Sequence, residues 1–372
     1  MARKVREIIE EMNRLAPPSL AMSWDAIGLQ IGSMDAMADT IFVALDLNQQ
    51  NLEEAIAEKC QLVITHHPVI FSPLKAIRTD EPEGRLISSL LNHQMSVFVA
   101  HTNMDIAVGG LNDWVVQKLQ LKNISLLETT EHEDLIKLVV FVPEESVDNV
   151  AEALSSAGAG HIGNYSHCTF RVRGTGTFKP LDGSSPAIGQ HNRIESVAEV
   201  RLETIISAAK QSTIIEAMIN AHPYEEVAYD LITLKNQGAS QGIGRIGEMD
   251  DSISPDEWID RLKTVFNVNS LRWVAGNSGE IRKAAVLTGS GASGITAAIT
   301  SGCDALVTGD IKYHDAQQAQ AAGLHLFDVG HFETERCFVT ITEDFLKRSF
   351  SEKGWQIKVI TDSNNKSPFE VV

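Results

Sequence analysis

Short apolar runs alternate with helical patterns in the first and last thirds of this chain, and this alternation restricts the possible folds more than any other feature. Buried strands are predicted at residues 41–46, 62–65, 96–100, 284–288, 305–310 and 324–329. Segments with helical periodicity lie between them, for example at residues 51–59 and 84–93. This strand–helix–strand order predicts a mostly parallel sheet between helices, which is an α/β fold.

The middle of the chain follows another pattern. Its predicted elements run strand, helix, strand, strand, helix, strand, which is the order of a ferredoxin-like α+β domain. Polar stretches at residues 128–134 and 235–242 flank this segment and are interpreted as linkers. Because 372 residues exceed one ordinary domain, we predict an inserted domain at 129–238 that splits the α/β domain into the halves 1–128 and 239–372.

Five polar side chains follow the ends of predicted strands. His66 and His67 come directly after one strand, and Asp105 lies just beyond the next. His331 and Glu335 follow the strand at 324–329, and a helix starting at the intervening glycine would place them on one face, one turn apart. Since the carboxyl ends of parallel strands share one edge of a sheet, we expect the five side chains to converge.

This set of side chains indicates a metal site. Three imidazoles and two carboxylates without a thiolate suit Zn, Mn, Fe or Ni. Five protein ligands exceed the three usual at a catalytic zinc ion, so a site with a bridging carboxylate accounts for them better. We therefore predict two divalent metal ions per chain, with zinc as the first choice. The alternative is that each histidine is an isolated loop or packing residue.

The turn Gly289–Gly294, between a predicted strand and a predicted helix, is a second candidate feature. It has the glycine spacing of a dinucleotide-binding turn, and Asp310 ends the next strand, where such folds bind a ribose. A backbone cradle for a substrate phosphate is favoured over that interpretation, and a close-packing turn is the remaining alternative. Ser290, Asp310 and His314 are candidates for contacting the substrate or supporting the metal ligands. The sequence identifies no catalytic acid or base.

Composition narrows the class of protein. The net charge of −18 disfavours nucleic acid as a partner, because such binding needs a basic face. The cysteines lack the spacing of a thiolate metal site and suggest a reducing compartment; they are Cys60, Cys168, Cys303 and Cys337. No apolar run is long enough to cross a bilayer, and the charged N-terminus does not have the pattern of a signal peptide. We expect a cytoplasmic protein without membrane contact.

Four motifs carry a resemblance to a known family. They are His66–His67–Pro68, His101–Thr102–Asn103–Met104–Asp105, Thr308–Gly309–Asp310–Ile311–Lys312–Tyr313–His314 and Gly330–His331–Phe332–Glu333–Thr334–Glu335. In these motifs the chain resembles the dinuclear-metal hexameric proteins called GTP cyclohydrolase I type 2-like. The middle segment, with His222–Pro223–Tyr224–Glu225, resembles the CutA/PII-like insert of the longer bacterial members. The family more often has Asn after the Asp of Trp24–Asp25–Ala26.

The resemblance has consequences for the site and the assembly. It implies metal ligation by His66, His67, Asp105, His331 and Glu335, with Glu335 shared by both ions. It also implies a toroidal homohexamer. It supports the metal site more strongly than the cyclohydrolase reaction.

Three functions compete at this point. The first is a metal-dependent hydrolase that acts on a nucleotide or another phosphorylated small molecule, as a GTP cyclohydrolase does. The second is a regulatory or ligand-binding ring that contains metal but performs no turnover. The third, a ring associated with nucleic acid, is disfavoured by the acidic composition.

Overall fold

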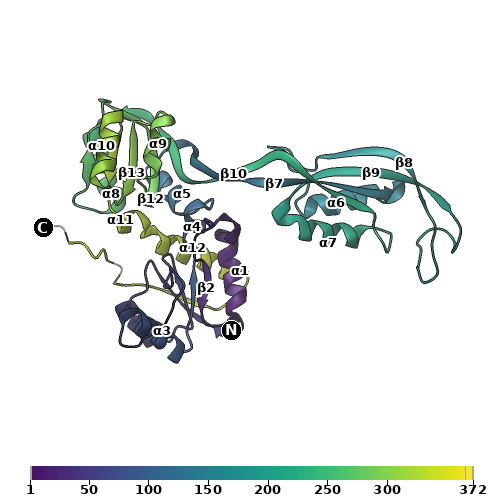
Figure 1. The fold of residues 1–372 in the computed structure, drawn as a ribbon, viewed down its shortest axis with the longest axis horizontal. Coiled ribbons are helices and arrows are strands. Elements are labelled where there is room, and N and C mark those ends of the chain that lie inside the picture. Colours follow the sequence, from purple (N-terminus) through teal and green to yellow (C-terminus); the bar gives the residue numbers. More distant parts are fainter. Residues whose placement is uncertain (1, 365, 371–372) are drawn as a thin grey trace. The chain divides into compact units, whose positions relative to one another are not determined.

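A computed structural model describes residues 2–364 and 366–370. Its contacts divide the chain into two compact units (Figure 1). The first, called the outer unit, consists of Met1–Thr130 together with Gln241–Val372. The second, called the middle unit, is Glu131–Ser240. No helix among the described residues combines the length and the apolar character needed to cross a membrane.

The first sheet of the outer unit has five strands, in the order β15 (Lys358–Thr361), β4 (Thr40–Ala44), β5 (Leu62–Thr65), β6 (Ser96–Val99) and β2 (Gly28–Ile31). The first four are parallel, and β2 runs antiparallel to β6. Apolar side chains of α1 (Val5–Leu15) and α12 (Cys337–Glu352) pack on one face, and those of α2 (Gln49–Ala57) and α3 (Pro82–Asn92) on the other. Burial on both faces explains why the parallel strands are continuous apolar runs.

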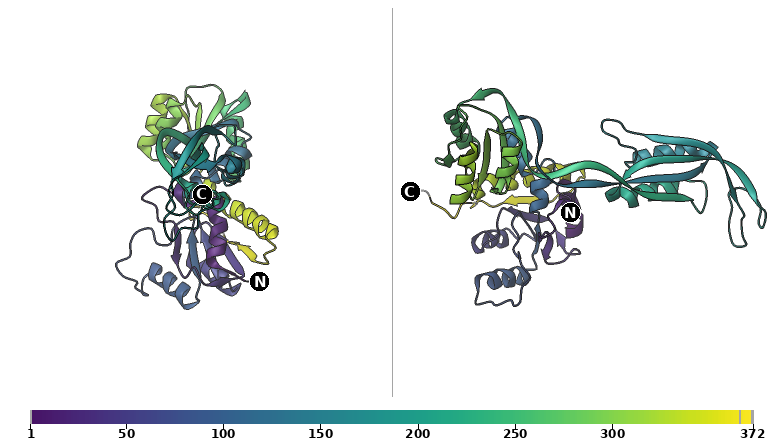
Figure 2. Two further views of the ribbon diagram at one scale, coloured as in Figure 1. Left: turned by 90° about the vertical axis from the view of Figure 1, so that its right-hand side faces the viewer. Right: turned by 45° about the horizontal axis from the view of Figure 1, so that its top comes forward.

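A second sheet holds the C-terminal half of the outer unit, in the order β11 (Arg272–Val274), β14 (His325–Asp328), β13 (Ala305–Gly309), β12 (Ile281–Ser290) and β10 (Tyr229–Ile253). Strands β12, β13 and β14 are parallel, and the other two are antiparallel to their neighbours. Helices α9 (Gly294–Thr300) and α10 (Tyr313–Ala322) pack on one face, and α8 (Pro255–Phe266) on the other (Figure 2).

Helices flank the sheets as the α/β prediction requires, but one detail of that prediction is wrong. The strands before His67 and before His331 belong to two sheets and not to one. A single hydrophobic core extends over side chains of both sheets, with α12 among its helices. The two rows of strand ends therefore meet inside one unit, which brings residues from both halves of the chain together.

Short elements connect these layers. Helices α4 (Thr102–Ile106) and α5 (Leu111–Lys118) follow β6, and α11 (His331–Glu335) follows β14. Near the N-terminus, β1 (Arg3–Lys4) pairs with β3 (Met37–Ala38), and Pro18–Leu20 forms a 3₁₀ turn.

The middle unit contains the predicted sequence of elements. After β7 (Lys122–Pro143) come α6 (Val147–Ser156), β8 (Thr169–Phe178), β9 (Glu195–Ser207), α7 (Gln211–Ala221) and β10, with 3₁₀ turns at Glu144–Ser146 and Ala208–Lys210. Its strands are ordered β10, β7, β9, β8, and its core joins α6 and α7 to one face of β7 and β9. The ferredoxin-like character of this unit and its CutA/PII-like relationship stay predictions.

The stretches predicted as linkers, 128–134 and 235–242, each contain a boundary between the two units, but their residues are in strands. Both stretches lie inside the long strands β7 and β10, which contribute to both units. Most side chains there are exposed or half-buried, so the sequence could be polar throughout. A strand without a buried face does not need apolar residues at every second position. Its sequence can therefore have the polar composition that is typical of a loop.

We expect the middle unit, Glu131–Ser240, to be removable as an inserted domain; the limits predicted from the sequence were 129–238. The outer unit ends at Thr130 on β7 and resumes at Gln241 on β10. The Thr130 hydroxyl donates to the carbonyl of Gln241 over 3.2 Å. A short Gly/Ser turn in place of 131–240 can therefore close β7 and β10 into a hairpin. The product should be folded and should bind as much metal as the full chain, measured by circular dichroism and elemental analysis. An insoluble or metal-free product with every linker length tried would contradict this division.

Candidate metal centre

The first two histidines of the site follow the last residue of β5. The backbone N–H groups of His66 and His67 both donate to the carbonyl of Leu45, at 3.2 and 3.0 Å. This shared acceptor replaces regular ladder pairing, so the two imidazoles are not forced to opposite faces as they would be within a strand. Their ring centroids are 5.1 Å apart. Asp105 comes from α4, directly after the neighbouring strand β6, and it is buried.

His331 and Glu335 come from the other sheet, at the end of β14. Gly330 precedes α11 with a φ of +111°, a conformation that favours glycine, and the helix begins at His331. Glu335 is four residues later and buried, and its Oε2 lies 2.9 Å from His331 Nε2. The predicted one-turn spacing of imidazole and carboxylate is confirmed.

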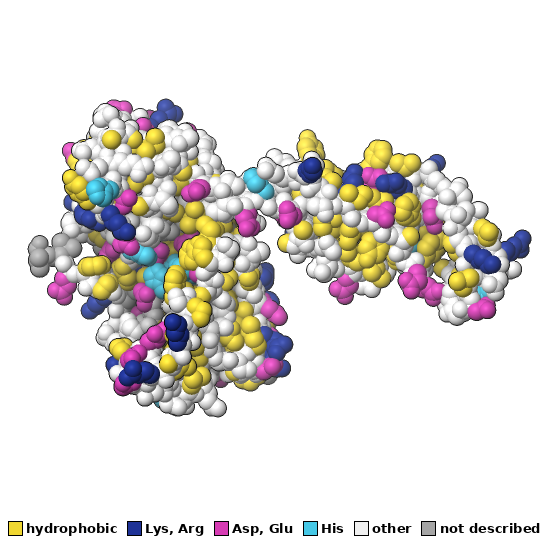
Figure 3. All heavy atoms as spheres, in the orientation of Figure 1, with side chains coloured by type: hydrophobic (Ala, Val, Ile, Leu, Met, Phe, Trp, Pro, Cys, Tyr) yellow, Lys and Arg dark blue, Asp and Glu magenta, His cyan; other side chains and the backbone are white. Residues whose placement is uncertain are grey.

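The five predicted side chains lie together in the outer unit. Glu335 is at their centre, because His67 Nε2 also lies 2.9 Å from its Oε2. On the other side, His66 Nε2 lies 3.8 Å from Glu335 Oε1 and 3.8 Å from Asp105 Oδ1. Glu335 and the pair His66 and His67 thus join the strand ends of two sheets. Histidine side chains reach the surface of this unit in the space-filling view (Figure 3).

A sixth side chain, His101, belongs to the cluster, and the sequence-based ligand set omitted it. Its ring centroid is 5.1 Å from that of His66 and 5.7 Å from that of His67. Three groups with mutually close donor atoms result: His66, His67, His101; His67, His331, Glu335; and His66, Asp105, Glu335. His101 is the first residue of one of the four family motifs, so its position directly after β6 was the available signal.

All four imidazoles are held in the same way. Each Nδ1 is within hydrogen-bond distance of an oxygen: His66 with Ala100 O at 2.9 Å, His67 with Asp46 Oδ1 at 2.6 Å, His101 with Asp25 Oδ1 at 2.8 Å, and His331 with Asp310 Oδ2 at 2.7 Å. These oxygens can only accept, apart from a protonated carboxyl group, so each Nδ1 carries the proton. The Nε2 atoms are left as the ring nitrogens that could bind a metal ion, which is how proteins orient ligating histidines.

The pKa values of the two buried carboxyl groups are shifted in opposite directions. Burial raises the pKa of Asp105 to about 7, against the attraction of His66. Burial also acts to raise the pKa of Glu335, but the hydrogen bond from His331 and the other nearby imidazoles lower it well below its usual range. Glu335 is therefore a carboxylate at neutral pH. Its negative charge lies where a cation or protonated imidazoles must compensate it.

The imidazoles beside Glu335 respond to the same charge. Burial lowers the pKa of His67, yet the hydrogen bonds to Asp46 and Glu335 raise it to about 10. For His331, the hydrogen bond to Glu335 raises the pKa to about 9 in spite of burial. Without a metal ion these Nε2 atoms are protonated and donate to Glu335. A bound metal ion would replace those protons on the same atoms.

One buried atom without a partner favours a metal site over a network of ion pairs that is complete in itself. His66 is fully buried, and its Nε2 has no hydrogen-bond partner. The 3.8 Å distances from this atom to the two carboxylates are too long for hydrogen bonds. A buried nitrogen left without a partner costs free energy. It faces the carboxylates of Asp105 and Glu335, and this donor set fits a divalent metal ion.

The glycine turn packs against this cluster. Gly289 donates its N–H to the Thr334 hydroxyl over 2.9 Å, and a Cβ on Gly289 would collide with the Glu335 carboxylate. A Cβ on Gly291 would collide with the Thr308 hydroxyl. The N–H of Gly294 is bonded to the carbonyl of Gly291, so these contacts favour the close-packing interpretation over a phosphate cradle. Ser290 is exposed at the end of β12.

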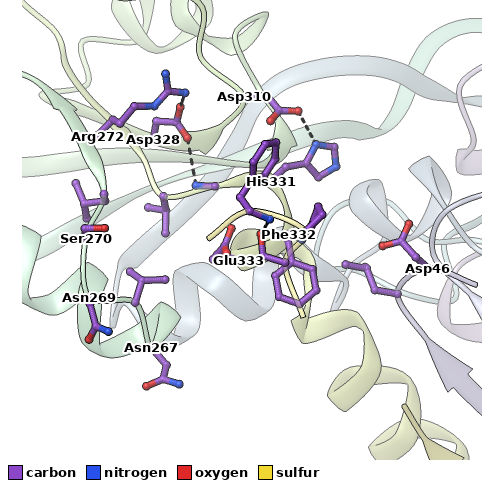
Figure 4. Close-up of a pocket in the computed structure, with 18 of the residues that line it drawn as sticks. Asp46, Asn267, Asn269, Ser270, Arg272, Asp310, Asp328, His331, Phe332 and Glu333 are labelled. Atoms are coloured by element: carbon purple, nitrogen blue, oxygen red, sulfur yellow. Dashed lines mark hydrogen bonds and ion pairs between the residues drawn. The ribbon is translucent and has the colours of Figure 1, made fainter. Parts of the chain in front are cut away.

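A cavity of about 970 Å³ opens beside the histidines (Figure 4). His67, His331 and Asp310 contribute to its wall, together with the loop Asn267–Arg272. Among the described residues that line the cavity, Arg272 is the one with a Lys or Arg side chain. Its guanidinium forms an ion pair with Asp328 and donates to the carbonyl of Ile311 at 3.0 Å.

The three predicted supporting residues thus have different positions. Asp310 contacts His331 directly and has a positive φ of 58°. His314 is exposed in α10, where its Nδ1 lies 3.1 Å from Gln317 Oε1. Ser290 is near the cluster only through the turn that it shares with Gly289. Substrate contacts by Ser290 and His314 stay predictions.

Comparisons with known proteins agree with each other. The family model described as Duf34/NIF3 (NGG1p interacting factor 3) matches residues 3–368. A Halalkalibacterium halodurans protein named GTP cyclohydrolase 1 type 2 homolog is 41% identical over 365 residues, 98% of each chain. The Bacillus subtilis protein of the same name is 39% identical and covers 99% of both chains. A crystal structure of a Bacillus cereus protein related to NIF3 has a TM-score of 0.93 at 39% identity, over 100% of this chain and 99% of that one.

Proposed function

The chain belongs to the Duf34/NIF3 family, and from that premise we propose that it is a dinuclear metal-dependent hydrolase acting on a nucleotide or another phosphorylated small molecule. One observation carries the proposal. Four imidazoles are each held at Nδ1 by an oxygen, and Nε2 of three of them, His66, His67 and His331, faces a buried carboxylate. Relatives named GTP cyclohydrolase 1 type 2 homolog support a nucleotide as the first substrate to test.

The ligand groups suggest how two ions would be held. His67, His331 and Glu335 form one group, and His66, Asp105 and Glu335 form another. Glu335 is in both groups, which supports its assignment as the shared ligand. His101 extends the predicted set on the side of His66 and His67. Zinc is the first choice for His and carboxylate donors, and Fe, Mn and Ni are compatible with the same set.

Bound divalent ions would supply activated water and polarise the electrophilic atom of the substrate. The chain itself contributes orientation. Asp25, Asp46 and Asp310 each fix one imidazole through Nδ1, so the Nε2 atoms do not rotate away from the site. By accepting a hydrogen bond from Nδ1, the three carboxylates also keep their imidazoles in one tautomer during substrate binding and reaction.

The cavity fits a phosphorylated ligand only together with the metal ions. Its wall contains four acids, Asp46, Asp310, Asp328 and Glu333, against the guanidinium of Arg272 and the imidazoles of His67 and His331, which are protonated in the absence of metal. A phosphate entering the metal-free cavity would meet net negative charge. Two divalent cations reverse that balance, and the guanidinium of Arg272 offers a second contact for a phosphate oxygen. Substrate binding should therefore depend on metal loading.

The test compares zinc-loaded and chelator-stripped full-length protein on GTP, other nucleotides and phosphorylated metabolites, with products separated by chromatography. We expect metal-dependent loss of a nucleotide, abolished in His67→Ala. His93→Ala, which removes an exposed imidazole at the end of α3, is the matched control and should not alter turnover. If no compound is consumed but one binds tightly to the metal-loaded protein, the second candidate, a ligand-binding or regulatory ring, replaces this proposal.

We also propose a homohexamer, on the family relationship alone. Light scattering at micromolar concentration should then give six times the mass of one 40.6 kDa chain. A monomer or dimer under these conditions would contradict the hexamer without affecting the metal site.

A further inference from the structure

Two large aromatic side chains are exposed to solvent beside the histidine cluster. Trp24 is 61% exposed and Phe71 is 60% exposed. Isolated exposed aromatics are common, but these two lie together, with ring centroids 6.2 Å apart. The indole of Trp24 also lies 6.3 Å from the imidazole of His101. The pair therefore borders the proposed metal site directly.

The segment that carries Trp24 is attached to the cluster by its next residue. The carboxylate of Asp25 accepts hydrogen bonds from His101 Nδ1 at 2.8 Å, from Thr102 N at 2.9 Å and from the Thr102 hydroxyl at 2.5 Å. Asp25 is thus bound by two adjacent residues at the end of β6. The backbone of Trp24 is therefore kept next to His101 by the contacts of the following residue.

The segment that carries Phe71 is fixed to the same place through Gln30. The amide of Gln30 donates to the carbonyls of Ala26 and Ile70, both at 2.8 Å. Its carbonyl oxygen accepts from the N–H of Ile70, also at 2.8 Å. One side chain therefore connects the residue two places after Trp24 to the residue before Phe71. The backbone segments that carry the two aromatic rings are therefore fixed beside each other before any ligand arrives.

The ring geometry leaves room for a third ring. Trp24 and Phe71 are inclined to each other by 51°, so neither covers the face of the other. Trp24 meets His101 at 76°, an edge-to-face contact that does not cover the indole either. A planar heterocycle stacked on Trp24 would lie one ring away from His101, within the reach of a nucleotide whose phosphates extend to the metal ions. Preorganised aromatic faces reduce the entropy lost when such a ring binds.

We infer that Trp24 and Phe71 form a stacking platform for the planar ring of the substrate, so that the substrate class is a nucleotide or another phosphorylated heterocycle and not a phosphorylated sugar. The inference rests on the proposed function, because it concerns the same site. It assigns the ring to the His101 side of the cluster and leaves the cavity beside His331 for the phosphate. The two aromatics act on binding and specificity and need no part in bond cleavage.

The experiment measures binding of GMP and of ribose 5-phosphate, which share the sugar phosphate and differ by the base, to zinc-loaded full-length protein by calorimetry. Wild-type protein should bind GMP more tightly. Trp24→Ala should weaken GMP binding by about 5- to 150-fold, the range that stacking of one base supplies, and leave ribose 5-phosphate unchanged. Phe71→Ala should have a smaller effect in the same direction, and Trp24→Phe should retain most of the preference.

Two controls keep the outcomes separate. Trp114→Leu removes a half-buried indole on α5 that lies against Lys118, and it should not change the ratio of the two affinities. Each variant must keep wild-type metal content and mass by light scattering.

Equal affinities of wild type for both ligands, or an unchanged ratio of the two affinities in Trp24→Ala and Phe71→Ala, would overturn the stacking platform alone. Loss of the assembly in Trp24→Ala with an unchanged ratio would identify Trp24 as a subunit contact and overturn it as well. Failure of both ligands to bind wild-type protein would overturn the proposed substrate class together with the platform.

Discussion

Glu335→Gln is expected to lose both metal ions. The carboxylate lies 2.9 Å from Nε2 of His67 and of His331, and its other oxygen faces His66. An amide of the same shape removes the negative charge and offers one oxygen where two are needed. Because both proposed ion positions use this side chain, neither should survive its neutralisation, although the fold should change little.

Elemental analysis of purified protein measures the outcome, and the expected change is from about two ions per chain to nearly none, since five or six ligands of this type fit a dinuclear site. Asp344→Asn on α12 is the matched control, because Asp344 is an exposed acid nine residues later in the chain, and its metal content should equal that of wild type. Two ions retained in Glu335→Gln would exclude the bridging role. One ion retained would restrict Glu335 to a single metal.

Arg245→Ala should strongly destabilise the outer unit. The buried guanidinium donates to the carbonyls of Gly242 and Gly244 at 2.9 Å and to that of Ile106 at 3.1 Å, and it forms an ion pair with Asp113. Its removal leaves those acceptors and a partly buried carboxylate without their partner. Breaking a buried pair in this way costs about 3–5 kcal/mol, which is a large part of the stability of an ordinary protein.

Denaturant unfolding followed by circular dichroism gives the loss, with the exposed Arg282→Ala as control. If Arg245→Ala does not accumulate as folded protein, Asp113→Asn provides the measurement, because it weakens the same ion pair and keeps the arginine. A loss below about 1 kcal/mol in Arg245→Ala, the level expected of an exposed ion pair, would show that these contacts are dispensable.

The sequence predicted the second half of the site well, because the information there is local. Gly330, His331 and Glu335 lie within six residues, so helix periodicity alone brings the imidazole and the carboxylate together. The first half depends on contacts between distant segments. His101 is oriented by Asp25, 76 residues earlier, and no spacing rule connects the two.

One prediction was wrong and another missed the local structure, for a different physical reason. The strand ends were expected to share one sheet, but β5 and β14 belong to separate sheets whose common core is a tertiary feature. The stretches 128–134 and 235–242 were interpreted as linkers because they are polar, whereas β7 and β10 pass through them as exposed strands. In both cases the pattern of apolar and polar residues indicates which side chains are buried. It does not indicate which strands pair with each other, because that depends on tertiary contacts.

The origin of the ligands from both ends of the chain has a consequence for biosynthesis. His66, His67, His101 and Asp105 leave the ribosome long before His331 and Glu335, and at about 5–20 residues per second the interval is roughly 10 to 50 s. Strand β15, which completes the first sheet beside β4, comes later still. During this interval the nascent chain carries three histidines without their central carboxylate. We expect metal to be acquired only after translation has ended, from the cellular pool of exchangeable ions.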